Sequence, residues 1–158
     1  MGAFIWHQWG RLVSMTASVY LIWAAIWGIL YRKFFWDFVG GVLEDTPTQK
    51  GITPGKNSAP FLAIIITVPL VQILSIVSGC TNLLVELPGP FVKRTRIHRS
   101  WILRIVLLIL QSFFGILFYQ GTNATAISLI AIFAFMMAWM KGERIERAEE
   151  NRDGDDTV

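Results

Sequence analysis

Long uncharged stretches alternate with short charged ones along this chain. Arg11 and Arg32 are separated by 20 uncharged residues, and Arg104 and Lys141 are separated by 36. A membrane-crossing helix needs about 20 predominantly apolar residues to cover a hydrocarbon core of about 30 Å. The pattern therefore predicts transmembrane helices.

The two longer uncharged stretches show how the chain must be divided. The stretch 57–85 contains Pro69, which removes a backbone donor and predicts a bend. The stretch 105–140 would form a helix of about 54 Å, too long for one crossing, so we expect it to fold back at Gly121, Thr122 and Asn123. The predicted spans are about 12–31, 60–85, 101–120 and 124–140.

These spans predict an all-α protein, a four-helix transmembrane bundle with short connections. The membrane domain covers residues 1–140, and the charged residues 141–158 form a cytosolic tail. Four spans place both termini and the second loop on one side of the membrane. That side holds 10 of the 14 Lys and Arg residues, so the positive-inside rule predicts that both termini are cytosolic. Which membrane is involved is not indicated.

Aromatic residues at the span ends agree with this orientation. Trp and Tyr favour the two membrane interfaces. The cytosolic belt is predicted to contain Trp6, Trp9, Trp101 and Trp139, and the other belt contains Phe34, Phe35, Trp36 and Tyr119.

Composition argues against several classes of protein. The chain is 54% hydrophobic and 16% charged, and its net charge of +3 lies in short clusters rather than along a groove that could bind nucleic acid. Cys80 is the single cysteine, so neither an internal disulfide nor a zinc site of paired cysteines is expected. Glycine-rich phosphate loops, nucleophile elbows and HExxH motifs are missing as well. We therefore expect no enzyme activity, no cofactor and no metal.

The ionisable residues near the span ends allow two interpretations. Glu86 and Arg104 could form a gating ion pair, but we expect two end charges that extend to water. His7 and His98 could ligate haem, but ordinary exposed histidines are expected. Asn123 opens a glycosylation sequon and is expected to be an unmodified turn residue.

Two carboxamides fall about midway through the predicted hydrocarbon. We expect Gln72 and Gln111 to face the bundle interior and to bond either each other or a backbone carbonyl that Pro69 leaves free. In a transporter, the same two residues would instead line a polar path.

The loop before the third span carries a basic cluster beside the membrane, where anionic lipid could attract it. The same charges could serve only to orient the chain. The cluster consists of Lys93, Arg94, Arg96 and Arg99.

Small residues four positions apart permit close contact between helices. We expect them to pack within the bundle rather than against a partner. The pairs are Ala24 with Gly28, Ser75 with Gly79, Ala124 with Ser128, and Ala134 with Ala138.

Two family resemblances can be stated on particular residues. The first resemblance is carried by the segment 6–11, the block 32–41, and 97–100 leading to 118–123. These segments resemble a family of small fungal membrane proteins of unknown function. That resemblance implies a fungal source and four spans. The second resemblance is carried by Met1 and Gly2 with Trp6 and Trp9, then by 89–91 and 142–143. These residues are similar to the small membrane subunit of animal NADPH oxidase, which stabilises a haem-bearing catalytic partner. That family's proline-rich tail is replaced here by an acidic one, which argues against recruitment of an SH3-bearing organiser.

The leading functional hypothesis is a noncatalytic membrane protein that acts as an interaction, assembly or stabilising subunit. Its expected partners are the lipid bilayer and either a larger membrane protein or further copies of itself. The alternative is a small transporter or channel with a polar path at Gln72 and Gln111.

Overall fold

The computed structural model describes residues 5–33, 57, 59–87 and 100–143. All regular elements in this part of the chain are helical, which confirms the predicted all-α class. The elements are α1 (Trp6–Leu30), α2 (Ala59–Leu62), the π-helical turn η3 (Ala63–Thr67), α3 (Leu70–Glu86), α5 (Trp101–Ile116), the 3-10 turn η5 (Tyr119–Gly121) and α6 (Thr122–Met140).

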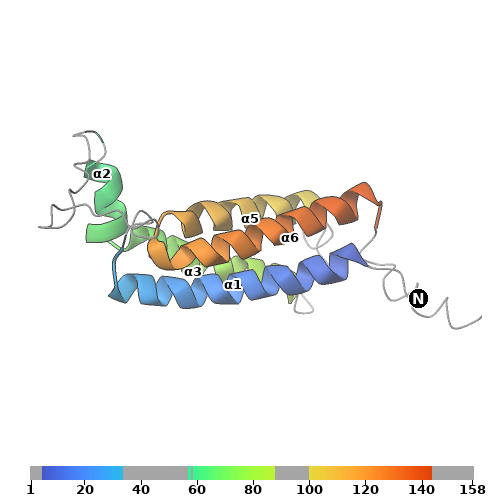
Figure 1. The fold of residues 1–158 in the computed structure, drawn as a ribbon, viewed down its shortest axis with the longest axis horizontal. Coiled ribbons are helices and arrows are strands. Elements are labelled where there is room, and N and C mark those ends of the chain that lie inside the picture. Colours follow the sequence, from blue (N-terminus) through green and yellow to red (C-terminus); the bar gives the residue numbers. More distant parts are fainter. Residues whose placement is uncertain (1–4, 34–56, 58, 88–99, 144–158) are drawn as a thin grey trace, which may run out of the picture.

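Four long helices lie side by side, and the short α2 stands apart from them beyond the C-terminal end of α1 (Figure 1). Helix α1 packs against α3 and α6, and α5 packs against the same two helices from the other side. The colours in Figure 1 show that α1 and α5 run in one direction and α3 and α6 in the other, so each helix is antiparallel to the two that it contacts most. The bundle has one interior, which all four helices surround.

The inward face of α1 advances in alternating steps of three and four residues. This is the spacing of helices that pack with a small left-handed crossing angle. The residues buried at this spacing are mostly small or polar: His7, Gly10, Ser14, Ala17, Leu21, Ala24 and Gly28.

Helices α3 and α6 repeat this pattern. On α3 the buried series includes Gln72, Ser75, Gly79, Asn82 and Glu86, and on α6 it includes Ala124, Ser128, Ala131, Phe135 and Ala138. All four pairs of small residues lie inside, so the prediction that they pack within the bundle is confirmed.

Large apolar side chains cover the outside instead. Trp23 is 58% exposed, Phe133 is 55% exposed and Leu84 is 65% exposed. A lipid solvent favours small and polar residues in the interior and large apolar residues on the surface, because lipid does not drive Leu or Phe inward.

The predicted bend at Pro69 is confirmed. The segments Pro60–Thr67 and Leu70–Glu86 meet at an angle of 68°. Val68 leaves the helical conformation just before the proline, with φ −110° and ψ 122°. A residue that precedes proline is pushed toward such extended angles by the proline ring.

Two described helices are long and apolar enough to cross a membrane, namely Trp6–Leu30 and Tyr119–Met140. The bent pair Pro60–Thr67 and Leu70–Glu86 makes a third if it is counted as one span. Helix α5 has 16 residues, fewer than the predicted span 101–120.

The turn between α5 and α6 differs from the predicted one. It was expected at Gly121 to Asn123, but α5 already ends at Ile116 and Thr122 begins α6, so Asn123 lies in the first helical turn. The reason is Phe118, which is extended, with φ −130° and ψ 149°, and fully buried. Its ring lies beside Gly28 of α1 and belongs to an apolar cluster with Leu21 and Val71, and the extended backbone at this residue directs it there.

Candidate functional site

The carboxamide of Gln111 lies at the centre of the bundle and bonds side chains of the three other long helices. Its Oε1 accepts hydrogen bonds from Ser18 Oγ at 3.1 Å and from Asn82 Nδ2 at 2.6 Å. Its Nε2 donates to Ser128 Oγ at 2.9 Å. Gln111 is only 1% exposed. One side chain of α5 thus joins α1, α3 and α6.

The serine partners also satisfy neighbouring backbone groups. Ser128 Oγ accepts from Gln111 and donates to the carbonyl of Ala124 at 2.8 Å. Ser18 Oγ lies 2.8 Å from the carbonyl of Ser14, so two acceptors share its single proton. Hydrogen bonds of this kind hold a serine within an apolar helix at little cost, because no donor is left bare.

Gln72 is fully buried and bonds the backbone rather than Gln111. Its Nε2 donates to the carbonyl of Ile65 at 3.0 Å. In a regular α-helix that carbonyl would accept from the amide of residue 69, which is a proline and has no amide proton. Gln72 thus replaces the donor that Pro69 removes. Of the two expected arrangements, the structure has the carbonyl bond, and the two glutamines do not bond each other.

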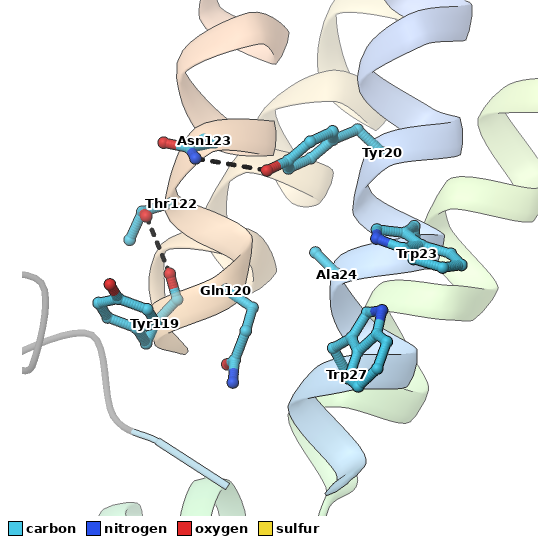
Figure 2. Close-up of a pocket in the computed structure, with 8 residues that line it drawn as sticks. All are labelled: Tyr20, Trp23, Ala24, Trp27, Tyr119, Gln120, Thr122 and Asn123. Carbon is cyan, nitrogen blue, oxygen red and sulfur yellow. Dashed lines mark hydrogen bonds between the residues drawn. The ribbon is translucent and has the colours of Figure 1, made fainter. Parts of the chain in front are cut away.

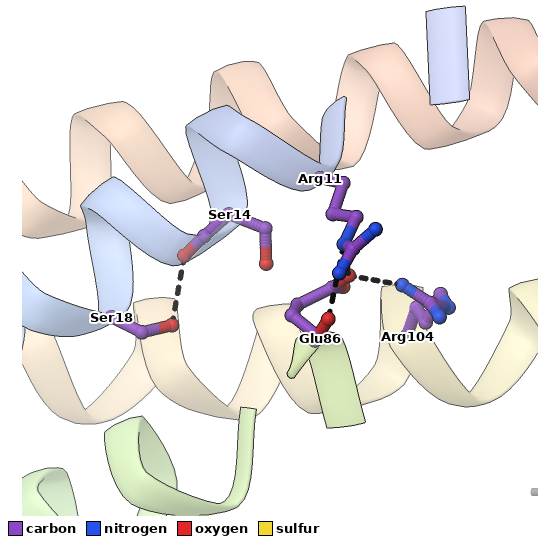
Figure 3. A network of polar contacts seen from close by, with 5 residues as sticks. All are labelled: Arg11, Ser14, Ser18, Glu86 and Arg104. Atoms are coloured by element: carbon purple, nitrogen blue, oxygen red, sulfur yellow. Dashed lines mark hydrogen bonds and ion pairs between the residues drawn. The ribbon is translucent and has the colours of Figure 1, made fainter. Parts of the chain in front are cut away.

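An ion pair is buried where α3 ends and α5 begins. Figure 3 shows the Glu86 carboxylate between two arginines. Arg104 Nη1 pairs with Glu86 Oε2. Glu86 is 2% exposed and Arg104 is 3% exposed. Arg11 Nε donates to the Glu86 carbonyl at 3.0 Å and lies 4.0 Å from the carboxylate. The expectation that Glu86 and Arg104 extend separately to water is wrong, because both lie on the inward faces of their helices.

His7 is also buried, contrary to the expected exposed histidine. It is 9% exposed, and its Nδ1 lies 3.2 Å from Oε2 of Glu143. The same carboxylate accepts from the backbone amides of Trp6, at 3.1 Å, and His7, at 2.9 Å. These amides begin α1 and have no partner within the helix. Glu143 therefore caps α1 from the other end of the described chain.

Other expected site residues lie elsewhere. The basic cluster of Lys93, Arg94, Arg96 and Arg99 and the second histidine, His98, fall outside the described residues. Asn123 is exposed, and its Nδ2 donates to the Tyr20 hydroxyl at 3.3 Å. Among the described residues, no group of three or more His, Cys, Asp or Glu could hold a metal ion.

The comparison with protein families decides to what group the chain belongs. A family model described as a domain of unknown function, DUF7727, matches residues 1–143. The chain belongs to the DUF7727 family. No curated protein and no solved structure matches it. The matched segment contains all the polar contacts described above, from His7 to Glu143.

Several members of the polar interior of this DUF7727 chain were not singled out from the sequence. Asn82, which bonds Gln111, lies ten residues after Gln72, and Ser75 and Gly79 stand between them in steps of three and four. A polar or small residue at each of these steps was the signal in the sequence that Asn82 lies on the same inward face. Glu143 was named only as part of a family resemblance, and no local signal predicted its contact with α1, which joins residues 136 and 137 positions apart.

Replacing Gln111 with leucine is expected to lower the free energy of unfolding by about 1 to 2 kcal/mol. Three side-chain hydrogen bonds are lost, and such bonds average about 0.6 kcal/mol within membranes. Gln72→Leu is the matched control, because it loses one bond, to the Ile65 carbonyl. Reversible unfolding in mixed detergent and SDS micelles, followed by circular dichroism, measures both. An equal loss in the two variants would contradict the central role of Gln111.

Proposed function

We propose that this DUF7727 chain is a noncatalytic, four-span integral membrane protein that assembles with a larger membrane partner and stabilises it. The observation that carries the proposal is the Gln111 junction, in which the polar groups at the centre of the bundle bond one another. An interior occupied in this way serves to hold helices together. The surface that is left to carry a function is the exterior of the bundle. It presents large apolar side chains that can pack against another membrane protein.

The proposed membrane placement counts four spans. Helices α1 and α6 have the required length, and the bent segment through Pro69 supplies a third span. Helix α5, about 24 Å long, is continued by the turn that contains Phe118. The basic excess of 10 to 4 supports cytosolic termini.

Aromatic contacts at one end of the bundle support the same placement. The ring centroids of Trp6 and Trp9 are 6.2 Å apart, and those of His7 and Trp101 are 6.1 Å apart. Trp139, near the end of α6, is 55% exposed. Such a group of tryptophans is typical of a membrane interface.

A rival proposal is a small transporter or channel, and one observation favours it. Oε1 of Gln72 is buried and has no hydrogen-bond partner among the described residues. In a conducting protein, water would occupy that position and continue toward Gln111. The assembly role explains more of the interior, because the Gln111 amide is engaged by protein groups on both its oxygen and its nitrogen.

Isolation of the full chain in a mild detergent distinguishes these two roles. We expect a larger membrane protein to co-purify in fixed stoichiometry, identified by mass spectrometry. The Gln111→Leu variant should recover less of it, and the Gln72→Leu control should recover nearly as much as the unaltered chain. Saturable solute uptake by liposomes that contain only the purified chain would overturn the assembly role.

Protease protection tests the proposed orientation. In sealed vesicles with the cytosolic face outward, a tag after Val158 should be digested, and a tag inserted after Lys50 should be protected. The reason is the basic excess on the side of the termini. A shielded tag at Val158 together with a digested one at Lys50 would reverse the assignment.

A further inference from the structure

An apolar hollow of about 540 Å³ opens on the surface between α1 and α3. Leu87, which lines it, directly follows Glu86, so the hollow begins at the end of the bundle that holds the buried ion pair. From there it extends along α1 to Trp23, near the middle of the uncharged stretch 12–31. Its lining consists of Met15, Thr16, Val19, Tyr20 and Trp23 of α1, with Leu83 and Leu87 on the other side.

The hydroxyl groups in this lining already have partners in the protein. Thr16 Oγ1 donates to the Leu12 carbonyl at 2.9 Å. The Tyr20 hydroxyl accepts from Asn123 Nδ2 at 3.3 Å on the opposite flank of α1 (Figure 2), where a separate hollow of about 240 Å³ lies against the beginning of α6. The hollow between α1 and α3 is therefore suited to a hydrocarbon chain.

Arg11 borders this hollow at the edge of the bundle, one helical turn before Met15. Figure 3 shows its side chain reaching from α1 to the end of α3. Its Nε donates to the Glu86 carbonyl at 3.0 Å, and the side chain is about half exposed. Among the described residues, no acceptor bonds its two terminal nitrogens. The guanidinium is thus held in place while its outer edge stays open.

Arg11 also keeps a positive charge that the neighbouring groups do not cancel. The Glu86 carboxylate can neutralise one guanidinium, and it pairs with the buried Arg104. Two arginines and one carboxylate leave one net positive charge, and Arg11 is the exposed member of the three. A guanidinium matches the geometry of a phosphate group with two parallel hydrogen bonds. An anion is therefore favoured at one end of an apolar hollow.

The length of the site matches one leaflet of a bilayer. From Arg11 to Trp23, twelve residues along α1 cover about 18 Å at about 1.5 Å per residue. One leaflet contributes about 15 Å to a hydrocarbon core of about 30 Å. An acyl chain that starts from a headgroup beside Arg11 therefore ends near Trp23. A helix of another protein would cross both leaflets and would extend well beyond the hollow.

We propose that Arg11 and the hollow between α1 and α3 bind one anionic phospholipid of the cytosolic leaflet. Its phosphate bonds the terminal nitrogens of Arg11, and one acyl chain lies in the hollow between Val19 and Leu83. The inference rests on the proposed membrane placement and not on the assembly role.

Photolabelling of the full purified chain in phosphatidylcholine liposomes tests the site. Two probes carry the same diazirine acyl chain, one on phosphatidylserine and one on phosphatidylcholine, and labelled residues are mapped by mass spectrometry. We expect the phosphatidylserine probe to label Met15, Val19 and Leu83 more strongly, and excess unlabelled phosphatidylserine to remove these labels. Equal labelling by the two probes, or labels spread evenly over α5 and α6, would overturn the proposal.

Arg11→Gln removes the cation and keeps a polar side chain. It should lower phosphatidylserine labelling of the hollow about tenfold and leave the weaker phosphatidylcholine labelling unchanged. Lys141→Gln is the matched control, because it removes an exposed cation at the same end of the bundle, where Lys141 Nζ lies 5.3 Å from the centre of the Trp6 ring. An equal loss in both variants would show general attraction to surface charge and would contradict the site.

Val19→Trp fills the hollow and leaves the ion pair intact, so it remains informative if Arg11→Gln is unstable. Val19 is exposed, and the larger side chain should remove the labels from Leu83 and Leu87. Ile109→Trp, which enlarges an exposed residue of α5 away from the hollow, should keep them. Unchanged labelling in Val19→Trp would contradict the site.

Labelling needs only the chain and a bilayer, so its result is independent of whether a protein partner co-purifies. If the two probes label the hollow equally and Val19→Trp prevents co-purification of the partner, the hollow holds a helix of that partner and the lipid proposal fails.

Discussion

Arg104→Leu is expected to lower the free energy of unfolding by about 3 to 5 kcal/mol. The variant leaves the Glu86 carboxylate buried beside apolar groups without its main partner, and a buried charge stripped of its partner is strongly destabilising. Arg11 compensates only in part, because it is 4.0 Å from the carboxylate and about half exposed. Unfolding in mixed detergent and SDS micelles gives the value.

The double variant Glu86→Leu with Arg104→Leu should recover most of this loss. Apolar residues can replace a buried ion pair with little net cost, because the desolvation of both charges is avoided. Lys33→Leu, which removes an exposed charge, should change stability by less than about 0.5 kcal/mol. A double variant as unstable as Arg104→Leu would show that the charges act separately rather than as a pair.

Gly121→Ala is expected to cost about 3 kcal/mol, at the upper end of the usual range for an overfilled interior. A Cβ at this position would overlap the carbonyl oxygen of Gly115 and would lie 2.7 Å from the tip of the Phe118 ring. A backbone oxygen cannot move aside unless the helix that carries it moves. The ends of α5 and α6 would therefore have to separate.

Gly28→Ala provides a graded comparison. Its added Cβ would meet the Phe118 ring at 2.9 Å and the Gln72 side chain at 3.1 Å. Both neighbours are side chains, which can shift, so the loss should be clearly smaller than for Gly121→Ala. Thermal unfolding of the two variants in the same detergent tests the order. The reverse order would show that the α5 to α6 turn tolerates a wider spacing.

Helix positions could be predicted because they depend on local signals. The length of the uncharged stretches predicted α1 and α6, and Pro69 predicted a bend, which has an angle of 68°. The turn after α5 could not be located in this way. Its cause, the burial of Phe118, depends on the space between helices that are distant in sequence. Gly121 does belong to this region, but it serves close packing on Gly115 rather than ending the helix.

The burial of the two glutamines could be predicted, but their depth and partners could not. Gln72 and Gln111 were expected inside at about the same level, and both are buried. However, Gln72 lies in the first turn of α3 beside Gly28, whereas Gln111 bonds Ser18 in the middle of α1. Which atoms they bond depends on the relative rotation and register of four helices. For Gln72, the missing amide of Pro69 was a local signal that pointed to a carbonyl as partner. For Gln111, Ser18 and Ser128 became partners only through the packing of α1 and α6 beside α5.

The cap on α1 has a consequence for synthesis of the chain. The amides of Trp6 and His7 are synthesised well before the Glu143 carboxylate that binds them, because they precede it by 137 and 136 positions. The first turn of α1 therefore cannot acquire its native partner until α6 has left the ribosome and entered the membrane. Until then, these amides must bond water or lipid headgroups. Closure of the bundle therefore depends on completion of α6. A chain that stops before residue 143 lacks the carboxylate that binds the first amides of α1.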